Sequence, residues 1–354
     1  MKALNHSRTM QFHLLDPARV PWNELDALPD RTVFQTRAWL DFLADSQGAR
    51  PVVAELRAGR DVAGYFTGAI IKRFGLRILG SSFRGWTTPY IGFNLLPGAT
   101  RREALQALET LAFGDLKCLH LEVSDRYMRP EQGADLGFEL EFYESYETDL
   151  TQPEEAIFNL MESACRRCVR KAEKSGVRIE VATDSAFAGE YYEQLKDVFA
   201  KQRLAPTYGP ERVEALVRHL LPSGNLLLLR ARDADGNSIG TGIYPGFNQV
   251  AQFWGNASWR ASQILRPNEA LHWYAMRYWK SRGISVFDWG GGGDYKEKYG
   301  PVPSSAPWFV KSRHKILSQM REQARALVTA RQKLKGRLFP DKEDPKESHA
   351  DVAG

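Results

Sequence analysis

Cysteine is scarce in this chain, which has only three among 354 residues. A low and odd count excludes the disulfide framework of a small secreted domain. Long apolar runs are missing as well, since no stretch reaches the roughly 18 residues that a membrane-spanning helix needs. The first residues include Asn5, His6 and Arg8 and lack the apolar core of a signal peptide. We therefore expect a cytoplasmic protein.

Motifs that mark several common enzyme classes are absent. The chain has no G-x-x-x-x-G-K-[ST] phosphate loop and no H-E-x-x-H zinc motif, and its seven histidines are scattered. Gly80–Gly85 does not match the G-x-S-x-G turn of serine hydrolases, and Gly290–Gly293 lacks the G-x-G-x-x-G spacing of dinucleotide sites. We interpret the C-x-x-C of Cys165 and Cys168 as one face of a helix, because no second pair accompanies it. We therefore expect neither a metal site nor a bound cofactor.

The net positive charge of the chain comes from its C-terminal end. The whole chain has 48 basic and 43 acidic residues and a net charge of +5, yet residues 311–354 alone hold 11 basic and 6 acidic side chains. The rest of the chain is therefore neutral, which argues against general nucleic-acid binding by the folded body. With 43% hydrophobic residues the composition is that of a globular protein, and the length suggests two domains.

The predicted elements occur twice in the same order: a β-hairpin, a further strand, a long helix and a buried strand. In the first copy we predict strands at 52–56, 62–71 and 118–123, an aromatic, glycine-rich stretch at 80–93, and a helix capped by Thr100. In the second copy we predict strands at 226–231, 238–244, 249–257 and 284–288, and a helix from Pro267 to Gly283. The pattern indicates an α/β (α+β) fold built from two similar units.

Composition also indicates where the two units meet. Residues 139–155 contain seven acidic side chains and no basic one, and we place a boundary near Leu150. A basic helix follows, since residues 165–178 contain six basic side chains and one acidic one. We predict domains at 1–150 and 151–310, followed by a segment at 311–354 with a basic helix over Lys311–Arg337 and disorder beyond Pro340.

The most distinctive cluster lies at 286–300, where a buried strand ends at Asp288 and four glycines follow. Glycines at the end of a strand let a substrate approach the backbone closely. Lys296 lies between Tyr295 and Tyr299, so its ammonium group is placed to bind a phosphate or a developing oxyanion. The alternative is a glycine loop with solvated lysines, and local chemistry does not separate the two.

Three segments carry a resemblance to a known family. They are Phe34-Gln35-Thr36-x-x-Trp39 in a helix that Thr36 caps and Gly48 ends, the basic helix with Arg170-Lys171-Ala172-x-x-x-Gly176-Val177, and Tyr295-Lys296-x-x-Tyr299-Gly300 after the Phe287-Asp288-Trp289-Gly290 strand end. In this order the set resembles the Fem family (FemAB-like) of acyltransferases, which are relatives of the GNAT N-acyltransferases. It extends over about residues 33–300.

The resemblance implies two GNAT-like domains, with mixed central sheets flanked by helices, and transfer of an acyl or aminoacyl group to an amine or hydroxyl. Fem enzymes take amino acids from aminoacyl-tRNA and add them to peptidoglycan precursors, and related families serve polysaccharide and lipid biosynthesis. The chain lacks the coiled-coil insertion of some tRNA-using members and the R/Q-x-x-G-x-G/A loop of acetyl-CoA-dependent GNAT enzymes. Aminoacyl-tRNA and acyl-CoA or acyl-carrier protein therefore both stay open as donors, with a small-molecule or lipid-linked acceptor.

On this pattern Lys296 takes the place of the functional lysine of the family, with Tyr295 and Tyr299 as walls of the site. Asp288 either orients the lysine or the acceptor amine, or caps the glycine loop. There are seven further candidates for substrate binding: Arg166, Arg167, Arg170 and Lys171 on the basic helix, and Tyr208, Trp254 and Asn256 beside the predicted cleft. Each has a structural alternative. The four basic residues would form a solvated helix face, and the other three would pack in the core.

Two further hypotheses compete with envelope-directed aminoacyl transfer. One is an acyl-CoA- or acyl-carrier-dependent N-acyltransferase of other small molecules, and the other is a non-catalytic protein that binds an anionic ligand in the same cleft. The basic segment Lys311–Arg337 either contacts the inner face of the membrane, near a lipid-linked acceptor, or docks on the second domain.

Overall fold

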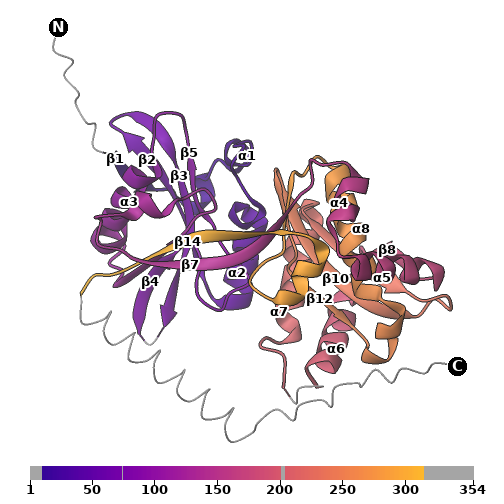
Figure 1. Ribbon diagram of the computed structural model, residues 1–354. Helices are drawn as coiled ribbons and strands as arrows, with labels where there is room; N and C mark the ends of the chain where they lie inside the picture. Colours follow the sequence, from indigo (N-terminus) through magenta and orange to yellow (C-terminus); the bar gives the residue numbers. More distant parts are fainter. Residues whose placement is uncertain (1–9, 74, 201–203, 315–354) are drawn as a thin grey trace, which may run out of the picture. The chain divides into compact units, whose positions relative to one another are not determined.

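A computed structural model describes residues 10–73, 75–200 and 204–314 (Figure 1), and those as far as Lys311 form one compact unit. The strands of the described residues join into one mixed 14-stranded sheet, with helices on both faces. The α/β class predicted from the sequence is therefore confirmed. We call residues 10–149 the first half and residues 154–311 the second half.

The elements of the first half are, in chain order, β1 (Met10–Leu14), α1 (Trp22–Asp26), α2 (Arg37–Gln47), β2 (Arg50–Ala58), β3 (Asp61–Arg73), β4 (Leu76–Gly80), β5 (Gly92–Leu95), α3 (Arg101–Thr110), β6 (His120–Ser124) and β7 (Glu139–Asp149). Those that follow are α4 (Glu154–Leu160), α5 (Ser163–Lys174), β8 (Arg178–Val181), α6 (Ala186–Ala200), α7 (Pro210–Leu220), β9 (Leu226–Arg232), β10 (Ser238–Phe247), β11 (Val250–Gln252), β12 (Gly255–Ser258), α8 (Pro267–Ser281), β13 (Val286–Asp288) and β14 (Val302–Ser312).

The two halves share one strand order. In the first half β1, β2, β3 and β4 are antiparallel neighbours and β4 runs parallel to β6. In the second half β8, β9, β10 and β11 are antiparallel neighbours and β11 runs parallel to β13. A helix, α3 or α8, connects the two parallel strands of each half. The repeat that the sequence predicts is therefore present.

The halves are joined through their last strands. β14 comes from the end of the described chain but lies between β6 and β7, while β7 pairs with both β14 and β13. Figure 1 shows these two long strands running from one half to the other. Because each last strand continues the sheet of the opposite half, the two repeats form one continuous sheet.

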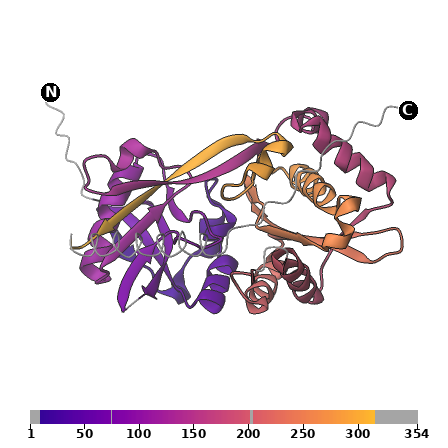
Figure 2. The ribbon, with the colours of Figure 1, turned by 60° about the horizontal axis from the view of Figure 1, so that its bottom comes forward.

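Helices cover both faces of this sheet and enclose its cores. Buried residues of α2, α6 and α7 share one core, those of α5 and α8 pack on the opposite face of the second half, and α3 covers the first half. Figure 2 shows α6 and α7, in rose, on one side of the second-half strands, with α5 and α8 on the other. The second half is thus a three-layer structure.

Short-range signals account for the helix ends that the sequence predicts. Thr36 caps α2 by accepting a hydrogen bond from the Trp39 backbone N–H, and Gly48 ends it in the left-handed conformation at φ +62°. Thr100 and Glu103 form a capping box at the start of α3. Gly176, at φ +78°, follows the basic helix α5.

The predicted strand at 249–257 is wrong as a single strand. It divides into β11 and β12, with Phe253 and Trp254 between them. The Phe253 N–H donates to Asp288 O at 2.8 Å, whereas the Trp254 N–H donates to Ile243 O at 3.1 Å. β11 therefore pairs with both β10 and β13, whereas β12 pairs with β10 alone and diverges from β13.

The C-terminal prediction falls mostly outside the described residues. Lys311 belongs to strand β14 rather than to a helix, and residues 315–337, together with the expected disorder beyond Pro340, are not described. Of the helices in the described part of the chain, none combines the length and the apolar character that a bilayer crossing requires.

Candidate functional site

The site is built where β12 diverges from β13. Gln252 and Asp288 are paired neighbours at the ends of the parallel strands β11 and β13, and Glu147 of β7 pairs with Asp288 on its other side. Paired residues of adjacent strands place their side chains on the same face of a sheet. Three polar side chains therefore form a row across the sheet, directly before the glycine run Gly290–Gly293.

Asp288 is buried, and its carboxylate accepts hydrogen bonds at both oxygens. Oδ1 accepts from Ser145 Oγ at 2.5 Å and from the Gly290 N–H at 2.7 Å, and Oδ2 accepts from Tyr90 Oη at 2.9 Å. Burial raises the pKa of Asp288, while Ser145, the Arg126 guanidinium and the Gly290 N–H oppose that rise. With these partners in place, Asp288 holds the glycine loop rather than offering a free base.

The glycine run, which we call the glycine loop (Gly290–Gly293), needs glycine at its two ends. Gly290 has φ +63°, and a Cβ there would lie 3.0 Å from Phe253 O. Gly293 has φ +146°, and a Cβ there would lie 3.0 Å from the Tyr295 ring. The Gly291 N–H donates to Tyr143 Oη at 2.5 Å, so side chains hold the loop from both sides.

Lys296 lies in a two-turn 3-10 helix, Asp294–Tyr299, that follows the glycine loop. Its side chain is only 5% exposed, and Nζ donates to Gly290 O at 2.7 Å and to Gly291 O. Burial lowers the pKa of Lys296 to about 8, against an opposing effect of the Asp288 carboxylate. The third ammonium hydrogen has no acceptor among the described residues.

A cluster of buried aromatic rings packs next to the 3-10 helix that carries Lys296. Tyr299 stacks on Trp289 with ring centroids 4.6 Å apart, and His272 packs against both rings. His272 Nδ1 lies 3.0 Å from Tyr244 Oη. Burial, together with the nearby lysine charges, lowers the pKa of His272 to about 3, so this imidazole stays neutral at physiological pH. It is a packing group, and it is unsuited to general acid catalysis near neutrality.

A cavity of about 310 Å³ opens on the glycine loop. Gly291 and Gly292 form one wall, and the other walls come from the first half and from β14. The aromatic members of the lining are Phe83, Trp86, Phe142, Tyr143 and Trp308. Since Lys296 binds the carbonyl of Gly291, its ammonium group lies behind the backbone that lines this cavity. We call it the loop pocket.

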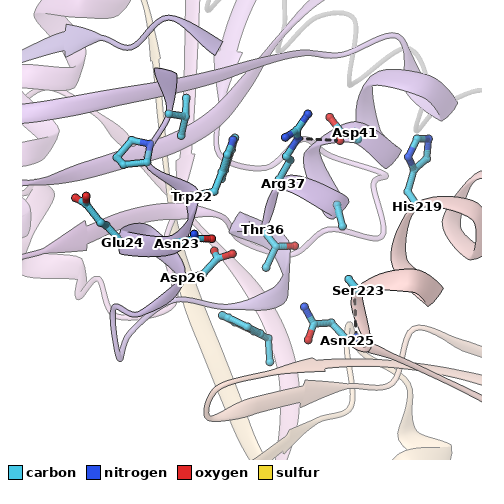
Figure 3. A pocket seen from close by; sticks show the side chains of 14 residues that line it. Trp22, Asn23, Glu24, Asp26, Thr36, Arg37, Asp41, His219, Ser223 and Asn225 are labelled. Carbon is cyan, nitrogen blue, oxygen red and sulfur yellow. Dashed lines mark hydrogen bonds and ion pairs between the residues drawn. The ribbon is translucent and has the colours of Figure 1, made fainter. Parts of the chain in front are cut away.

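A larger pocket, of about 850 Å³, lies elsewhere between α1, α2, α7 and the start of β9 (Figure 3). Figure 3 shows Thr36 at the start of α2, His219 of α7 and Asn225, which precedes β9, among the residues that line it. Four of its charged lining residues are Glu24, Asp26, Asp41 and Arg37. Because three of these four are acidic, the pocket is poorly suited to a phosphate group. No residue of the glycine loop lines it.

Comparisons with known proteins agree with this geometry. Residues 161–299 match the GNAT acetyltransferase domain. The solved structure of FemX is similar to this chain with a TM-score of 0.68 and 14% sequence identity, over 87% of this chain and 99% of FemX. No curated protein matches the sequence.

The chain has a tandem GNAT fold. Two further structures share its fold at a TM-score of 0.50 and 13% identity. One is a tandem GNAT protein from the clavulanic acid biosynthesis pathway, with 86% of this chain and 98% of that chain covered. The other is L-PGS from Bacillus licheniformis, with 81% and 90% covered.

Within this tandem GNAT fold the structure brings together four of the residues singled out from the sequence. Lys296 and Asp288 meet through the glycine loop, since both bind Gly290. Tyr299 is buried behind the loop, whereas the Tyr295 side chain is 54% exposed with its ring 5.7 Å from Lys296 Nζ. Tyr295 is thus placed to contact a ligand directly, and Tyr299 is placed to support the lysine.

The basic helix α5 packs against α8 and the 3-10 helix that carries Lys296. Three of its cations are engaged: Arg166 donates to Met161 O and to Asn159 O, Arg167 donates to Ser163 Oγ at 3.4 Å, and Arg170 lies over the Phe158 ring at 5.3 Å. Arg167 and Lys171 are nevertheless exposed.

Two of the three candidates beside the strand end, Tyr208 and Trp254, belong to the core on the opposite face of the second half. Tyr208 Oη lies 3.0 Å from Tyr191 Oη, and its ring packs on Trp254 at 5.8 Å. Trp254 joins the core of α6 and α7, yet its buried Nε1 has no hydrogen-bond partner. Asn256 lies in β12, opposite Gly242 of β10. The structure therefore places Tyr208 and Trp254 together but gives neither of them a contact with Lys296.

Sequence reasoning missed the polar partners of Asp288. Tyr90, Arg126 and Ser145 come from the first half, and no local pattern relates them to a strand end more than 140 residues away. Gln252 had a weak signal, since it is the one polar side chain in the apolar run Val250–Trp254. It is 3% exposed, and its Oε1 has no partner. Among the described residues no group of acidic, histidine or cysteine side chains is arranged to hold a metal ion.

Proposed function

We propose that this enzyme transfers an acyl or aminoacyl group to an amine, or to a hydroxyl, of a cell-envelope peptidoglycan, polysaccharide or lipid precursor, and that the reaction takes place at the glycine loop. The observation that carries the proposal is the Lys296 ammonium group, held on two glycine carbonyls directly behind the backbone wall of the loop pocket. The match of residues 161–299 to a GNAT domain supports it.

The chemistry requires positioning and one cation. The acceptor amine attacks the carbonyl carbon of an ester or thioester, a C–N bond forms, and the C–O or C–S bond of the donor breaks. The amine proton leaves with the departing alcohol or thiol, so the reaction is balanced without a further reactant. The tetrahedral intermediate carries an oxyanion, and a donor aimed at such an oxygen contributes about 3–4 kcal/mol to catalysis.

Lys296 is the group that can make this contact. Two of its three hydrogens fix Nζ on Gly290 and Gly291, and we assign the third to the oxyanion. A buried cation held in place before the reaction needs no reorganisation at the moment of attack. Tyr295 and the aromatic lining of the loop pocket position the acceptor against it.

Two donor classes fit the proposal, each on a different observation. The Fem-like fold and the exposed cations Arg167 and Lys171 favour aminoacyl-tRNA, whose phosphates such side chains bind. The match to an acetyltransferase domain favours acyl-CoA or acyl-carrier protein, and then an N-acyltransferase of other small molecules. We place aminoacyl-tRNA first, because FemX is more similar in structure to this chain than the tandem GNAT protein is.

Donor consumption tests the proposal. The protein is incubated in turn with aminoacyl-tRNA, acetyl-CoA and longer acyl-CoA, together with a pool of amino sugars, lipid-linked precursors and small amines. Release of deacylated donor that depends on the acceptor supports the proposal and identifies the donor class. Consumption of none of the donors, with each acceptor class present, contradicts it.

We also propose peripheral contact with the inner face of the membrane through Lys311–Arg337, which would bring the enzyme to a lipid-linked acceptor. The nine basic residues in this segment support it, since each adds to attraction by anionic lipid. Flotation with anionic liposomes should decrease on removal of residues 315–354. Equal flotation of the shortened and the full chain contradicts this proposal.

A further inference from the structure

The first half of the chain, which lies outside the GNAT domain match, reaches the reaction site through Tyr90. Tyr90 precedes β5, is 2% exposed, and packs edge-on against Phe34 with ring centroids 5.4 Å apart. Its hydroxyl donates to Asp288 Oδ2 at 2.9 Å. A contact across 198 residues thus joins the two halves at the base of the glycine loop.

Arg126 orients that hydroxyl. Its Nη1 donates to Tyr90 Oη at 3.2 Å and to Glu147 Oε1 at 2.7 Å, and lies 3.9 Å from Asp288 Oδ2. Since Tyr90 Oη accepts from the guanidinium, its own hydrogen is left to point at the carboxylate. Ser145, also from the first half, donates to the other carboxylate oxygen at 2.5 Å.

The hydrogen bonds continue from Asp288 to the lysine. Asp288 Oδ1 accepts from the Gly290 N–H, and the carbonyl of the same glycine accepts from Lys296 Nζ at 2.7 Å. The path therefore has three bonds: Tyr90 to Asp288, Asp288 to Gly290, and Gly290 to Lys296. The charge of Asp288 also acts on the lysine directly, because it opposes the fall in the pKa of Lys296 that burial causes.

We propose that Tyr90 is a positioning residue for the transfer reaction: its hydroxyl keeps Asp288 ionised and fixed, and Asp288 in turn holds the glycine loop and Lys296 in the arrangement that binds the oxyanion. The first half thereby sets the activity of a site whose reacting groups belong to the second half. This inference rests on the proposed function for its effect on turnover, but not for its effect on Lys296.

Tyr90→Phe tests the inference, since it removes the hydroxyl and keeps the ring that packs on Phe34. Without this donor the buried carboxylate of Asp288 takes up a proton more readily, and its support for the charged lysine is lost. The ammonium of Lys296 should then titrate at a pH about 0.5 or more below its wild-type value. Turnover should fall about tenfold or more through kcat, with a smaller change in KM.

The titration is followed by NMR of protein labelled at the lysine ε-carbons, with Lys296→Arg to assign the signal. Tyr65→Phe is the matched control, because this half-buried tyrosine of β3 has no contact with the site. If Tyr90→Phe does not fold, Ser145→Ala removes another first-half donor to Asp288 and should move the titration in the same direction.

A downward shift in the titration of Lys296 in Tyr90→Phe or Ser145→Ala, absent in Tyr65→Phe, supports the inference. An unchanged titration overturns it, even where stability or turnover falls, because a purely structural tyrosine would lower stability alone. If the wild type turns over no donor, the proposed function fails, while the titration still decides this inference.

Discussion

At the scale of single residues, Lys296 combines two properties that usually exclude each other, a charge and a buried position. The carbonyls of Gly290 and Gly291 replace part of its hydration, and the Asp288 charge lies nearby. Burial nevertheless prevails and lowers its pKa to about 8, against 10.5 for an ordinary lysine. The group is therefore charged at neutral pH but close to titration.

The pKa of Lys296 predicts opposite responses of activity and stability to alkaline pH. If the ammonium form binds the oxyanion, kcat should fall as pH rises through about 8. The unfolded chain, whose lysine titrates near 10.4, binds more protons than the folded one between these values, so the Lys296 contribution to the free energy of unfolding rises with pH there.

A pH series of kcat and of urea unfolding, each compared with Lys296→Met, measures the two responses. The rise in stability between about pH 8 and 10.4 should be smaller in the variant, because methionine has no proton to lose. A kcat that increases through pH 8 would show that the neutral amine is the active form and would contradict the oxyanion role.

At the scale of elements, the position of the 3-10 helix that carries Lys296 depends on the backbone conformation of one glycine. Gly300 ends the 3-10 helix that carries Lys296, with φ +72°, and a Cβ there would lie 2.2 Å from Leu160 O at the end of α4. Any side chain at position 300 would therefore force α4 and the 3-10 helix Asp294–Tyr299 apart. The close approach explains the glycine of the Tyr–Lys–x–x–Tyr–Gly pattern.

Gly300→Ala should lower the free energy of unfolding by about 3 kcal/mol or more, through left-handed strain and this clash together. Gly236→Ala is the matched control, since it has φ +87° with open space around its Cβ position and should cost only about 1–2 kcal/mol. Urea unfolding of both variants measures the difference. Equal losses would mean that the close approach to Leu160 does not occur.

The elements also show how far the sequence predicts the structure. Caps at Thr36 and Thr100, and the sequence of hairpin, strand, helix and strand, follow from local patterns and are present. The break between β11 and β12 has no such signal, because it arises where Phe253 bonds to β13 and Trp254 to β10. Pairing across the sheet overrides a continuous apolar run.

The residues of the site also fall into those that the sequence predicts and those that it does not. Asp288, the glycines and Lys296 lie within nine residues, so their meeting could be predicted from adjacency and from the Fem-like pattern. Tyr90 and Ser145 reach Asp288 from another part of the chain, through the tertiary fold alone. A single sequence holds no periodicity or spacing that encodes such a contact.

At the scale of the whole molecule, the two repeats exchange their last strands, and each repeat contributes different residues to the site. β14 and β7 make one sheet of two GNAT-like halves, so a loop of the first half can line a pocket of the second. The second half supplies Lys296 and the glycine loop, and the first half supplies the aromatic wall and the anchors of Asp288. Neither half alone contains the complete site.

The most direct test of this account is the turnover of Lys296→Met, measured with the donor and acceptor that the donor screen identifies. The account predicts that kcat falls about 10²–10³-fold while circular dichroism and the unfolding midpoint show a folded protein. Lys196→Met, at an exposed lysine on α6, should keep the wild-type rate. A folded Lys296→Met protein that turns over at the wild-type rate would contradict the account.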